Sequence, residues 1–476
     1  MKFDSLGEFI DTVKRLGELK VIENADWDLE IGALTELTAE RSGPALLFDH
    51  IKGYPAGFRV LTNAFATPRR TALVHGLPSE LTALEMLRAW KEKLKDFKPV
   101  PPVMVTEAPV KENILLGKDI DLFRFPAPKW HEMDGGRYLG TGCCVITRDP
   151  DEGWVNLGTY RCMLQGKNLI NVKAVVGKHG RLMMNKYHAR GQPCPIAVTF
   201  GQAPALYAAA CDMTVPWGVS EYEFAGWMRG APIAVVKGEV TDLPIPATAE
   251  IVIEGEVPPP PFAPVAEGPF GEWTGYYSGV AHGTEPLMTV KAILYRDNPI
   301  ILGEPELKPP IPCHFAIPRN AAGVWNQIEK ADIPGIKGVW FITGSINPDV
   351  LVIAIKQQYA GHAKQAAVVG AGCRAGSLGG RVVIVVDDDI DITNAQEVMW
   401  AVASRSQAED VDIIRALWTT PADPMLDNAE RSQNLTTSSR LIINACRPWA
   451  RIKDFPLVNR FSQEYRDKML KKWSTF

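Results

Sequence analysis

Two clusters of proline residues divide this chain and limit what it can fold into. One lies at residues 99–102 and the other at 309–312, and the residue pattern changes at each. Proline breaks helices and central strands, so both clusters are typical of linkers. A chain of 476 residues is also too long for one compact core. We therefore predict a 1–105 N-terminal α/β domain, a 106–305 central domain, a 306–445 C-terminal α/β domain and a 446–476 tail.

The outer segments show helical periodicity, whereas the central segment shows strand patterns. A Ser5–Glu8 capping-box signature precedes an amphipathic run, and residues 79–95 repeat that character. From 106 to 295, short apolar or alternating runs broken by glycine and proline favour β-rich, barrel-like structure. The C-terminal segment alternates between the two patterns; its predicted elements are helices near 319–331 and 393–405, the second capped by Thr393 and Gln396, and strands 350–355 and 382–386.

Composition places the chain among ordinary globular proteins and gives no sign of a nucleic-acid partner. It has 51 basic and 55 acidic residues, and a net charge of -4. The N-terminus lacks the apolar core of a signal peptide, and no apolar run approaches membrane-spanning length. The eight cysteines show no CxxC pair and no disulfide-framework spacing, so we expect reduced thiols in a cytoplasmic protein.

Two motifs resemble cofactor or metal sites but have simpler explanations. Gly370-x-Gly372-x-x-Ala375 matches a loose dinucleotide fingerprint, yet too few residues follow Ala375 for the required helix before the next apolar run. The acidic run 387–389 ends a predicted strand, where a solvated edge is more common than a metal site. We interpret neither as a binding site.

A short stretch around Asn156 combines several functional groups. Residues 154–161 contain Asn156, a glycine that permits close approach, and the cation Arg161; His179 and Glu221 follow in turn-like contexts. An amide oxygen, an imidazole and a carboxylate together suit Mn2+ or Mg2+ better than a thiolate-loving metal. On a flat strand Asn156 and Arg161 would point to opposite faces, unless Gly158 hosts a bulge.

Glu267 and Glu272 form a second candidate group. The intervening Gly-Pro-Phe-Gly can fold both carboxylates toward one cavity, although two exposed loop glutamates would give the same pattern. Two close carboxylates cannot both ionise freely, so we expect a cation to hold one of them charged while the other carries a proton. Arg161 is the candidate cation.

Together these residues resemble the UbiD-like reversible decarboxylases over nearly the whole chain. The resemblance implies an α/β N-terminal domain, a central split β-barrel that binds prenylated flavin mononucleotide, and a C-terminal α/β domain used for dimerisation. The motifs that carry it are Asn156-Leu-Gly-Thr-Tyr-Arg161, Gly-Lys178-His179-Gly, Ala-Arg-Gly-Gln-Pro-Cys-Pro-Ile196, Ser220-Glu-Tyr-Glu-Phe-Ala-Gly226, Glu267-Gly-Pro-Phe-Gly-Glu272, Lys356-Gln-Gln-Tyr-Ala-Gly-His-Ala363 and Asp387-Asp-Asp-Ile-Asp391.

The resemblance also implies roles for individual residues. Asn156, His179 and Glu221 would bind a Mn2+ or Mg2+ ion that bridges the protein to the flavin phosphate. Arg161, Glu267 and Glu272 would form the catalytic network, with Glu272 as proton donor. The implied flavin-binding residues are Asn156, Leu157, Gly158, Thr159, Tyr160, Arg161, Lys178, His179, Met213, Glu221 and Arg381. The residues implied around a K+ ion, which would share Glu221, are Trp154, Ala210, Cys211 and Met213.

The chemistry that the resemblance implies requires an electron sink. Loss of CO2 from an sp2 carbon leaves an anion with no conjugated sink, and acid-base catalysis, worth roughly 10²- to 10⁴-fold, is insufficient. The modified flavin would supply that sink, while Arg161 binds the substrate carboxylate and Glu272 protonates the product carbon. We expect an aromatic, heteroaromatic or α,β-unsaturated carboxylic acid as substrate, with His314 beside the pocket.

The expected partners are the acid, CO2, a flavin prenyltransferase that supplies the cofactor, and at least one further copy of the chain. Residues 455–472 contain apolar side chains that can pack across a subunit boundary. Two alternatives are a flavin-binding carboxylase subunit without turnover and a split-barrel FMN oxidoreductase. The intact Arg161, Glu267 and Glu272 argue against the first, and the metal-ligand set argues against the second.

Overall fold

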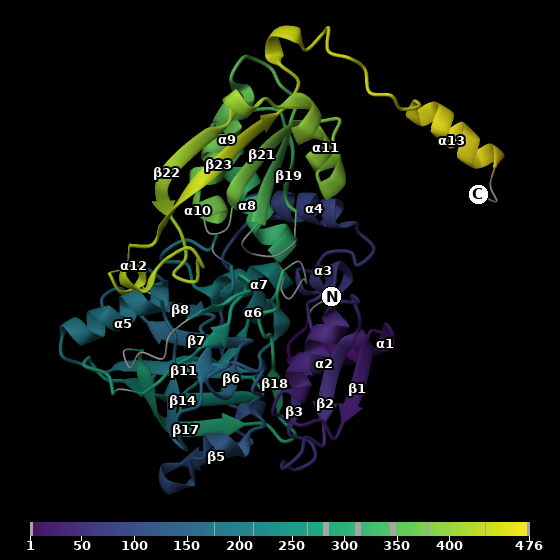
Figure 1. Ribbon diagram of the computed structural model, residues 1–476. Coiled ribbons are helices and arrows are strands. Elements are labelled where there is room, and N and C mark those ends of the chain that lie inside the picture. The colour runs from purple at the N-terminus through teal and green to yellow at the C-terminus, as the bar shows by residue number, and fades with distance from the viewer. Residues whose placement is uncertain are drawn as a thin grey trace.

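The structure, a computed structural model, describes residues 3–175, 177–212, 214–263, 265–278, 285–309, 316–342, 349–377, 380–433 and 435–473. Figure 1 shows an N-terminal part beside a larger central part, a C-terminal sheet above them, and a final helix that projects away. In the described residues no helix is both long and apolar enough to cross a membrane. The predicted site residues Met213 and His314 lie outside the described ranges.

The N-terminal part is a four-stranded sheet with helices around it. The strand order is β1-β2-β3-β18, so a strand from near residue 300 completes it. β1 and β2 pair in parallel, β2 and β3 antiparallel, and β3 and β18 in parallel. The elements are α1 (Leu6–Arg15), β1 (Leu19–Glu23), α2 (Glu30–Ala39), β2 (Ala45–Asp49), β3 (Arg59–Thr62), α3 (Pro68–Val74), α4 (Ala83–Lys95) and β18 (Ile300–Leu302).

Two helix starts in this part differ from the predicted ones. Ser5 accepts a hydrogen bond from the Glu8 amide at 3.2 Å, but the Glu8 carboxylate accepts from the amide of residue 4 instead of Ser5. Only half of the predicted capping box therefore forms. The 79–95 segment becomes helical at residue 83, because Thr82 and Glu85 form a reciprocal capping box there.

The central part is rich in β-structure, as predicted. Its main sheet follows the order β10-β17-β14-β11-β7-β8, with β5 paired to β17; smaller groups are β13-β12-β4, β15-β16 and β6-β9. The strands are β4 (Val103–Met104), β5 (Asn113–Leu116), β6 (Tyr138–Gly140), β7 (Cys143–Arg148), β8 (Val155–Gly158), β9 (Cys162–Met163), β10 (Leu169–Asn171), β11 (Cys194–Phe200), β12 (Ala234–Lys237), β13 (Pro244–Pro246), β14 (Ile251–Val257), β15 (Phe270–Gly271), β16 (Tyr277–Ser278) and β17 (Leu287–Tyr295). The helices are α5 (His179–Ala189), α6 (Pro204–Ala210) and α7 (Glu221–Arg229).

The C-terminal part is a mixed sheet with helices, and it contains each helix and strand predicted there. The strand order is β19-β20-β21-β23-β22. The elements are α8 (Ala316–Lys330), β19 (Ile336–Phe341), β20 (Asp349–Ile355), α9 (His362–Gly372), α10 (Arg374–Ser377), β21 (Gly380–Asp387), α11 (Ala395–Arg405), β22 (Asp412–Trp418), α12 (Asn428–Ser432), β23 (Thr437–Ala445) and α13 (Gln463–Lys472). Short 3-10 turns occur at Pro109–Lys111, Gly117–Asp119, Leu122–Arg124, Ala408–Asp410 and Trp449–Arg451.

Three details of the C-terminal part correct the sequence reading. The fingerprint glycines at 370 and 372 lie inside α9 instead of a strand-to-helix turn, and α10 occupies the region where we expected no helix. Asn394, not Thr393, caps α11. The acidic run is a solvated edge only in part: Asp388 and Asp389 are exposed, but Asp387 is 1% exposed and lies 3.1 Å from both Arg405 and Arg447. Asp387 and Asp389 both pair with Arg405.

Candidate active site

Arg161, Glu267 and Glu272 come from separate segments and meet in the structure. Arg161 lies between β8 and β9, and the two glutamates precede and follow β15. The Lys173 amide donates to the Arg161 carbonyl at 3.0 Å, which fixes the backbone there. No bulge at Gly158 is involved, because β7 and β8 pair in regular register and β8 ends at that residue. The strand ends before Arg161, so the alternation of side chains along a strand does not determine where the Arg161 side chain points.

Arg161 binds both carboxylates. Its Nε and Nη2 donate to Oε1 and Oε2 of Glu267 at 2.7 and 2.9 Å, and its Nη1 donates to Oε1 of Glu272. Tyr138 donates to Oε1 of Glu267 at 3.2 Å, and Ser278 donates to Oε1 of Glu272 at 2.5 Å. The Glu267 side chain is 0% exposed and the Glu272 side chain is 12% exposed. The three predicted catalytic residues therefore form one network.

Neighbouring charges keep Glu267 ionised. Burial alone would raise the pKa of Glu267, but Arg161 and Lys173, whose Nζ lies 3.5 Å from Oε2, hold this pKa below its usual range. Burial also opposes the charge on Arg161, yet the Glu272 and Glu267 carboxylates raise the pKa of Arg161 well above its usual value. Burial and the Glu267 charge raise the pKa of Tyr138, so its phenol remains a hydrogen-bond donor. Arg161 and Glu267 thus form a permanent ion pair.

The loop between the two glutamates is held by close backbone contacts. Gly268 has a φ of 87°, a conformation that glycine adopts without strain. The Gly135 amide donates to the Pro269 carbonyl at 2.8 Å. Asp134 accepts from the Gly271 amide at 3.1 Å. These contacts explain how Gly-Pro-Phe-Gly directs both carboxylates toward Arg161.

Asn156, His179 and Glu221 gather around the end of β8. Asn156 is buried in that strand, and the next amide, of Leu157, donates to Glu221 at 2.7 Å. His179 and Glu221 are the first residues of α5 and α7. The His179 ring centre lies 5.8 Å from that of Trp154. The predicted metal ligands therefore belong to one neighbourhood.

The properties of these three residues suit a bound cation. Burial raises the pKa of Glu221 to about 8. Burial and the charges of Arg374 and Lys178 lower the pKa of His179 to about 4, so its ring is neutral and able to bind a metal. Asn156 is buried and offers an amide oxygen as a ligand. An amide, a neutral imidazole and a carboxylate that needs a counter-charge together fit Mn2+ or Mg2+.

Among the described residues, no group of three or more His, Cys, Asp or Glu side chains is placed to hold a metal ion. The candidate set of Asn156, His179 and Glu221 differs from such a group because one of its ligands is an amide.

The residues that follow Asn156 pack tightly against each other. A Cβ on Gly158 would lie 2.4 Å from the Tyr160 Oη, so this position requires glycine. Thr159 Oγ1 lies 3.3 Å from the sulfur of Cys211, which follows α6. Ala210 is the last residue of α6. The end of α6, where two of the predicted K+ carbonyls lie, is thus placed beside the predicted flavin-binding stretch.

The two lysine and arginine residues that the resemblance adds to the flavin site outside the Asn156–Arg161 stretch, Lys178 and Arg381, lie in different parts of the fold. Lys178 directly precedes α5. Arg381 lies on β21 in the C-terminal sheet, where it forms an ion pair with Asp423. Arg374 on α10 was not predicted, yet its charge acts on His179. Arg374 therefore joins Lys178 as a basic residue near the candidate cation site.

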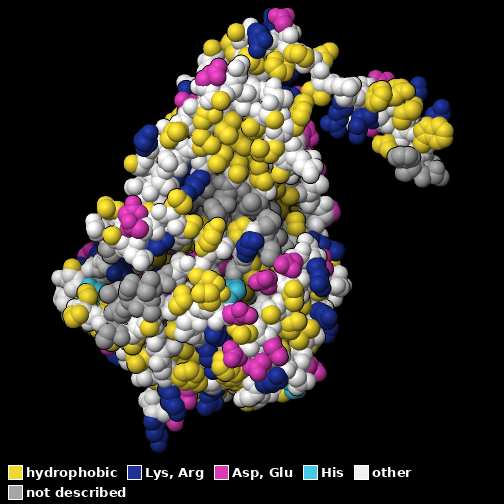
Figure 2. Space-filling model, viewed as in Figure 1, with side chains coloured by type: hydrophobic (Ala, Val, Ile, Leu, Met, Phe, Trp, Pro, Cys, Tyr) yellow, Lys and Arg dark blue, Asp and Glu magenta, His cyan; other side chains and the backbone are white. Residues whose placement is uncertain are grey.

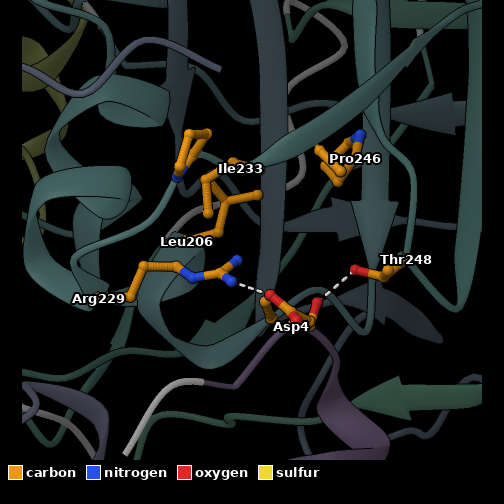
Figure 3. Close-up of a pocket in the computed structure, with 9 residues that line it drawn as sticks. Asp4, Leu206, Arg229, Ile233, Pro246 and Thr248 are labelled. Carbon is orange, nitrogen blue, oxygen red and sulfur yellow. Dashed lines mark hydrogen bonds and ion pairs between the residues drawn. The ribbon is translucent and has the colours of Figure 1, made fainter. Parts of the chain in front are cut away.

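A cavity of about 230 Å³ lies away from both groups (Figure 3). Asp4 at its rim forms an ion pair with Arg229, and its carbonyl accepts a hydrogen bond from Thr248. Leu206 in α6 and Arg229 at the end of α7 line it. Glu221 lies at the opposite end of α7. This cavity is therefore separate from the candidate active site.

Comparison with known proteins identifies the family. Models of the N-terminal, Rift-related and C-terminal domains of 3-octaprenyl-4-hydroxybenzoate carboxy-lyase match residues 10–90, 103–306 and 313–445. Pyrrole-2-carboxylic acid decarboxylase of Pseudomonas aeruginosa is 31% identical, over 92% of this chain and 90% of the relative. The chain belongs to the UbiD family. It is a carboxy-lyase, as the sequence motifs predicted.

Solved UbiD-class structures share this fold. The closed form of Sedimentibacter hydroxybenzoicus vanillic acid decarboxylase matches with a TM-score of 0.85 at 28% identity, over 100% of both chains. HmfF from Pelotomaculum thermopropionicum in complex with FMN matches with a TM-score of 0.82 at 30% identity, over 98% of this chain and 100% of that one. An evolved dimeric form of HmfF in complex with prFMN gives 0.79 at 28% identity, over 97% and 98%. The predicted fold class is thereby confirmed.

Several polar residues of this UbiD-family site were not predicted. Tyr138 and Lys173 contact Glu267, Ser278 contacts Glu272, and Asp134 holds the β15–β16 hairpin. Each is a single polar residue outside the recognisable motifs. Antiparallel pairing of β6 with β9 brings Tyr138 beside the strand that follows Arg161, and only the folded chain displays that proximity.

Proposed function

We propose that this UbiD-family enzyme reversibly decarboxylates an aromatic or heteroaromatic carboxylic acid with prenylated FMN, and that Glu272 is the proton donor. The observation that carries the proposal is the difference in hydrogen bonds and nearby cations between the two glutamates bound to Arg161. Glu267 receives two donors from Arg161 and one from Tyr138, with Lys173 close by. Glu272 receives one from Arg161 and one from Ser278. Glu267 is suited to remain an anion, and Glu272 to exchange a proton.

Arg161 would orient the substrate carboxylate. When Glu272 is protonated, its bond to Nη1 of Arg161 weakens because the acceptor loses its charge. Nη1 can then donate to the substrate carboxylate while Nε and Nη2 stay on Glu267. The guanidinium is further fixed over the Phe270 ring, at 4.8 Å from its centre. This arrangement aligns the carbon–carboxylate bond that breaks.

Glu272 would exchange one proton with the substrate carbon in each turnover. The substrate loses its carboxylate as CO2, and the electron pair left on carbon takes the Glu272 proton to form the new C–H bond. Solvent then restores the proton to Glu272, whose side chain is 12% exposed. In the carboxylation direction the same carboxylate removes the proton.

Asn156, His179 and Glu221 would hold a Mn2+ or Mg2+ ion that binds the flavin phosphate, with Lys178 and Arg374 adding positive charge. When bound, prenylated FMN supplies the electron sink that no side chain offers. A K+ ion would use carbonyls at Trp154, Ala210 and Cys211 and share Glu221. The burial of Asn156, which offers an amide oxygen as a ligand, and the raised pKa of Glu221 support this cation site.

The relatives support a ring-bearing acid as substrate. One is a pyrrole-2-carboxylic acid decarboxylase and another a vanillic acid decarboxylase. Holoenzyme with bound metal should release CO2 from at least one acid in a panel of pyrrole-2-carboxylic, vanillic and 3,4-dihydroxybenzoic acids, with an acrylic acid for contrast. Mass analysis of the released flavin should find the prenylated form. Unmodified FMN in an enzyme that releases no CO2 from any acid of the panel would favour the oxidoreductase alternative.

We also infer that a cytoplasmic homodimer is the minimal assembly, matured by a flavin prenyltransferase. Figure 2 shows hydrophobic side chains gathered on the C-terminal part. Ile413 and Trp418 on β22 are 60% and 43% exposed, and Leu457 and Phe461 in the tail are 96% and 72% exposed. Light scattering at micromolar concentration should give at least twice the chain mass. A stable monomer would contradict the dimer.

A further inference from the structure

Lys173 lies beside the catalytic network and is engaged on two sides. Its Nζ lies 3.5 Å from Oε2 of Glu267 and pairs with the carboxylate of Glu285. Its amide donates to the Arg161 carbonyl at 3.0 Å, so the two basic residues are joined through the backbone. The Lys173 and Glu285 side chains are only 22% and 21% exposed. Neither residue belongs to a motif that carried the family resemblance.

Glu285 is held in register with the segment that carries Lys173. The Val172 amide donates to the carbonyl of Pro286 at 3.0 Å, and the Asn171 side chain contacts the same carbonyl at 3.4 Å. Both partners of the Lys173–Glu285 ion pair therefore lie next to fixed backbone. A pair held in this way retains its geometry better than two exposed, flexible side chains.

The charges of this cluster balance when its carboxylates hold one proton between them. Arg161 and Lys173 are cations, and Glu267 and Glu285 are anions. The cluster is neutral when Glu272 carries a proton and carries one net negative charge when Glu272 is ionised. Without Lys173 the cluster would hold an excess negative charge, and Glu267 would compete with Glu272 for the proton.

We propose that Lys173 and Glu285 are positioning residues which balance the charge of the Arg161 network, so that its exchangeable proton resides on Glu272. The proposal rests on the proposed role of Glu272 as proton donor and explains what keeps the proton there. Lys173 stabilises the Glu267 anion, and Glu285 keeps Lys173 from making the site too positive to retain the proton. Glu267 and Glu285 thus share one cation between them.

Other titratable groups near Glu272 are few and are engaged elsewhere. His131 packs against Gly271, and Asp134 accepts from the Gly271 amide. Lys308 lies against Gly275, at the tip of the hairpin. Around Glu272 and its hairpin, the charged and titratable groups of the described residues include Arg161, Glu267, Tyr138, Lys173, Glu285, His131, Glu132, Asp134, Tyr276, Tyr277, Lys308 and, acting on Tyr277, Glu36. Lys173 and Glu285 are the pair that joins the network through Glu267.

The test is an infrared titration of the flavin- and metal-loaded enzyme without substrate. The C=O stretch of a protonated carboxyl is recorded against pH, and the Glu272 band is identified by its loss in Glu272→Gln. Lys173→Met should move the disappearance of this band to higher pH, and Glu285→Gln should move it to lower pH. Each shift should be about one pH unit, or about tenfold in proton affinity, for one unit charge nearby.

Matched variants separate this role from a structural one. Lys173→Arg should restore the wild-type titration because it restores the charge. Lys237→Met and Asp242→Asn remove the two ends of an exposed ion pair and should leave the band unchanged. If the band vanishes in Glu272→Gln but Lys173→Met and Glu285→Gln shift it in the same direction, or not at all, the charge-balance proposal is wrong while the proton-donor role stands. A band that persists in Glu272→Gln would overturn both.

Discussion

The Arg161 network (Arg161, Glu267 and Glu272) and the Asn156 cluster (Asn156, His179 and Glu221) each bury a glutamate, but the pKa values of these two glutamates shift in opposite directions. Glu267 and Glu221 are 2% and 4% exposed. Arg161 and Lys173 hold the pKa of Glu267 below its usual range, whereas burial raises the pKa of Glu221 to about 8. The difference lies in the counter-charge, because Arg161 and Lys173 pair directly with Glu267, whereas the basic residues near the other group, Lys178 and Arg374, act on His179. Burial alone therefore does not decide the protonation of a site; its charged partners do.

The largest expected effect follows from removing the proton that we propose Glu272 donates. Glu272→Gln keeps a side chain of the same size that can still accept from Ser278, but it cannot carry the proton. Turnover should fall by roughly 10²-fold or more, the scale of a lost general acid. Exchange of the product ring hydrogen with solvent deuterium should also nearly cease. Both are measured on holoenzyme with equal flavin content.

Glu223→Gln is the matched control for that variant. Glu223 caps α7 by accepting from the Ser220 amide at 3.1 Å, and a glutamine oxygen can do the same. This variant should stay within a few-fold of wild type. Near-normal exchange in Glu272→Gln with its flavin bound would remove the proton-donor assignment and favour Glu267.

A second expected effect concerns Asn156, His179 and Glu221, which we propose to hold a metal ion. His179→Ala should lower metal affinity by about 10- to 100-fold and lower flavin retention in parallel, because one ion would join the phosphate to the protein. Metal analysis and flavin absorbance on the same sample measure both. His188→Ala, on the same helix, is the control, because the His188 ring bonds the Val257 carbonyl at 3.1 Å and packs against Phe262. Full flavin occupancy in a metal-free His179→Ala would contradict the shared ion.

The two regions were not equally predictable from the sequence. Arg161, Glu267 and Glu272 lie in recognisable motifs, and the structure brings them together. Alternation along a strand wrongly suggested that Arg161 needs a bulge, because that rule ends where β8 ends. Lys173 and Tyr138 escaped detection because their function depends on partners distant in sequence. A sequence motif identifies the residues within it, but the residues that contact them come from distant segments and are known only from the folded structure.

The parts of the fold also differed in how well the sequence predicted them. Helices with clear periodicity, such as α1 and α8, and apolar strands such as β21 were predictable to within a few residues. Their caps were less so, since Ser, Thr, Asn and Asp compete to cap the same helix start; Asn394 rather than Thr393 caps α11. The burial of Asp387 was missed because Arg405 and Arg447 reach it from other elements. Local sequence determines where a helix or strand forms, whereas tertiary contacts determine whether its charged side chains are buried and paired.

A third, smaller effect tests whether Glu221 lacks a cationic partner in the metal-free protein. In metal-free protein at pH 7, Glu221 should hold a proton because burial raises its pKa to about 8, and His179 should be neutral with a pKa of about 4. Binding of Mn2+ should therefore release about one proton at pH 7, and fewer as pH rises above 8. Calorimetry in two buffers of different ionisation enthalpy measures the number. Release that does not vary between pH 6.5 and 9 would be inconsistent with a protonated Glu221.

The smallest expected effect concerns stability and tests the opposite claim, that the network is already balanced. The folded state lowers the pKa of Glu267 from its ordinary value of 4.5. The unfolded chain therefore binds the proton more tightly, so Glu267 stabilises the fold fully above about pH 4.5 and loses that contribution as pH falls through the folded pKa. Each unit of lowering corresponds to about 1.4 kcal/mol. Glu267→Gln should be less stable than wild type at pH 7, and the two should converge below pH 4.

Thermal unfolding midpoints of wild type and Glu267→Gln across pH 3 to 8 measure that difference. Glu80→Gln, which changes an exposed glutamate of the N-terminal part, should follow the wild-type curve throughout. A constant gap between wild type and Glu267→Gln at every pH would mean that the loss reflects packing. A gap that grows as pH falls would reverse the sign and show that Glu267 is protonated in the fold. Only a gap that closes on acidification fits a carboxylate held ionised by Arg161 and Lys173.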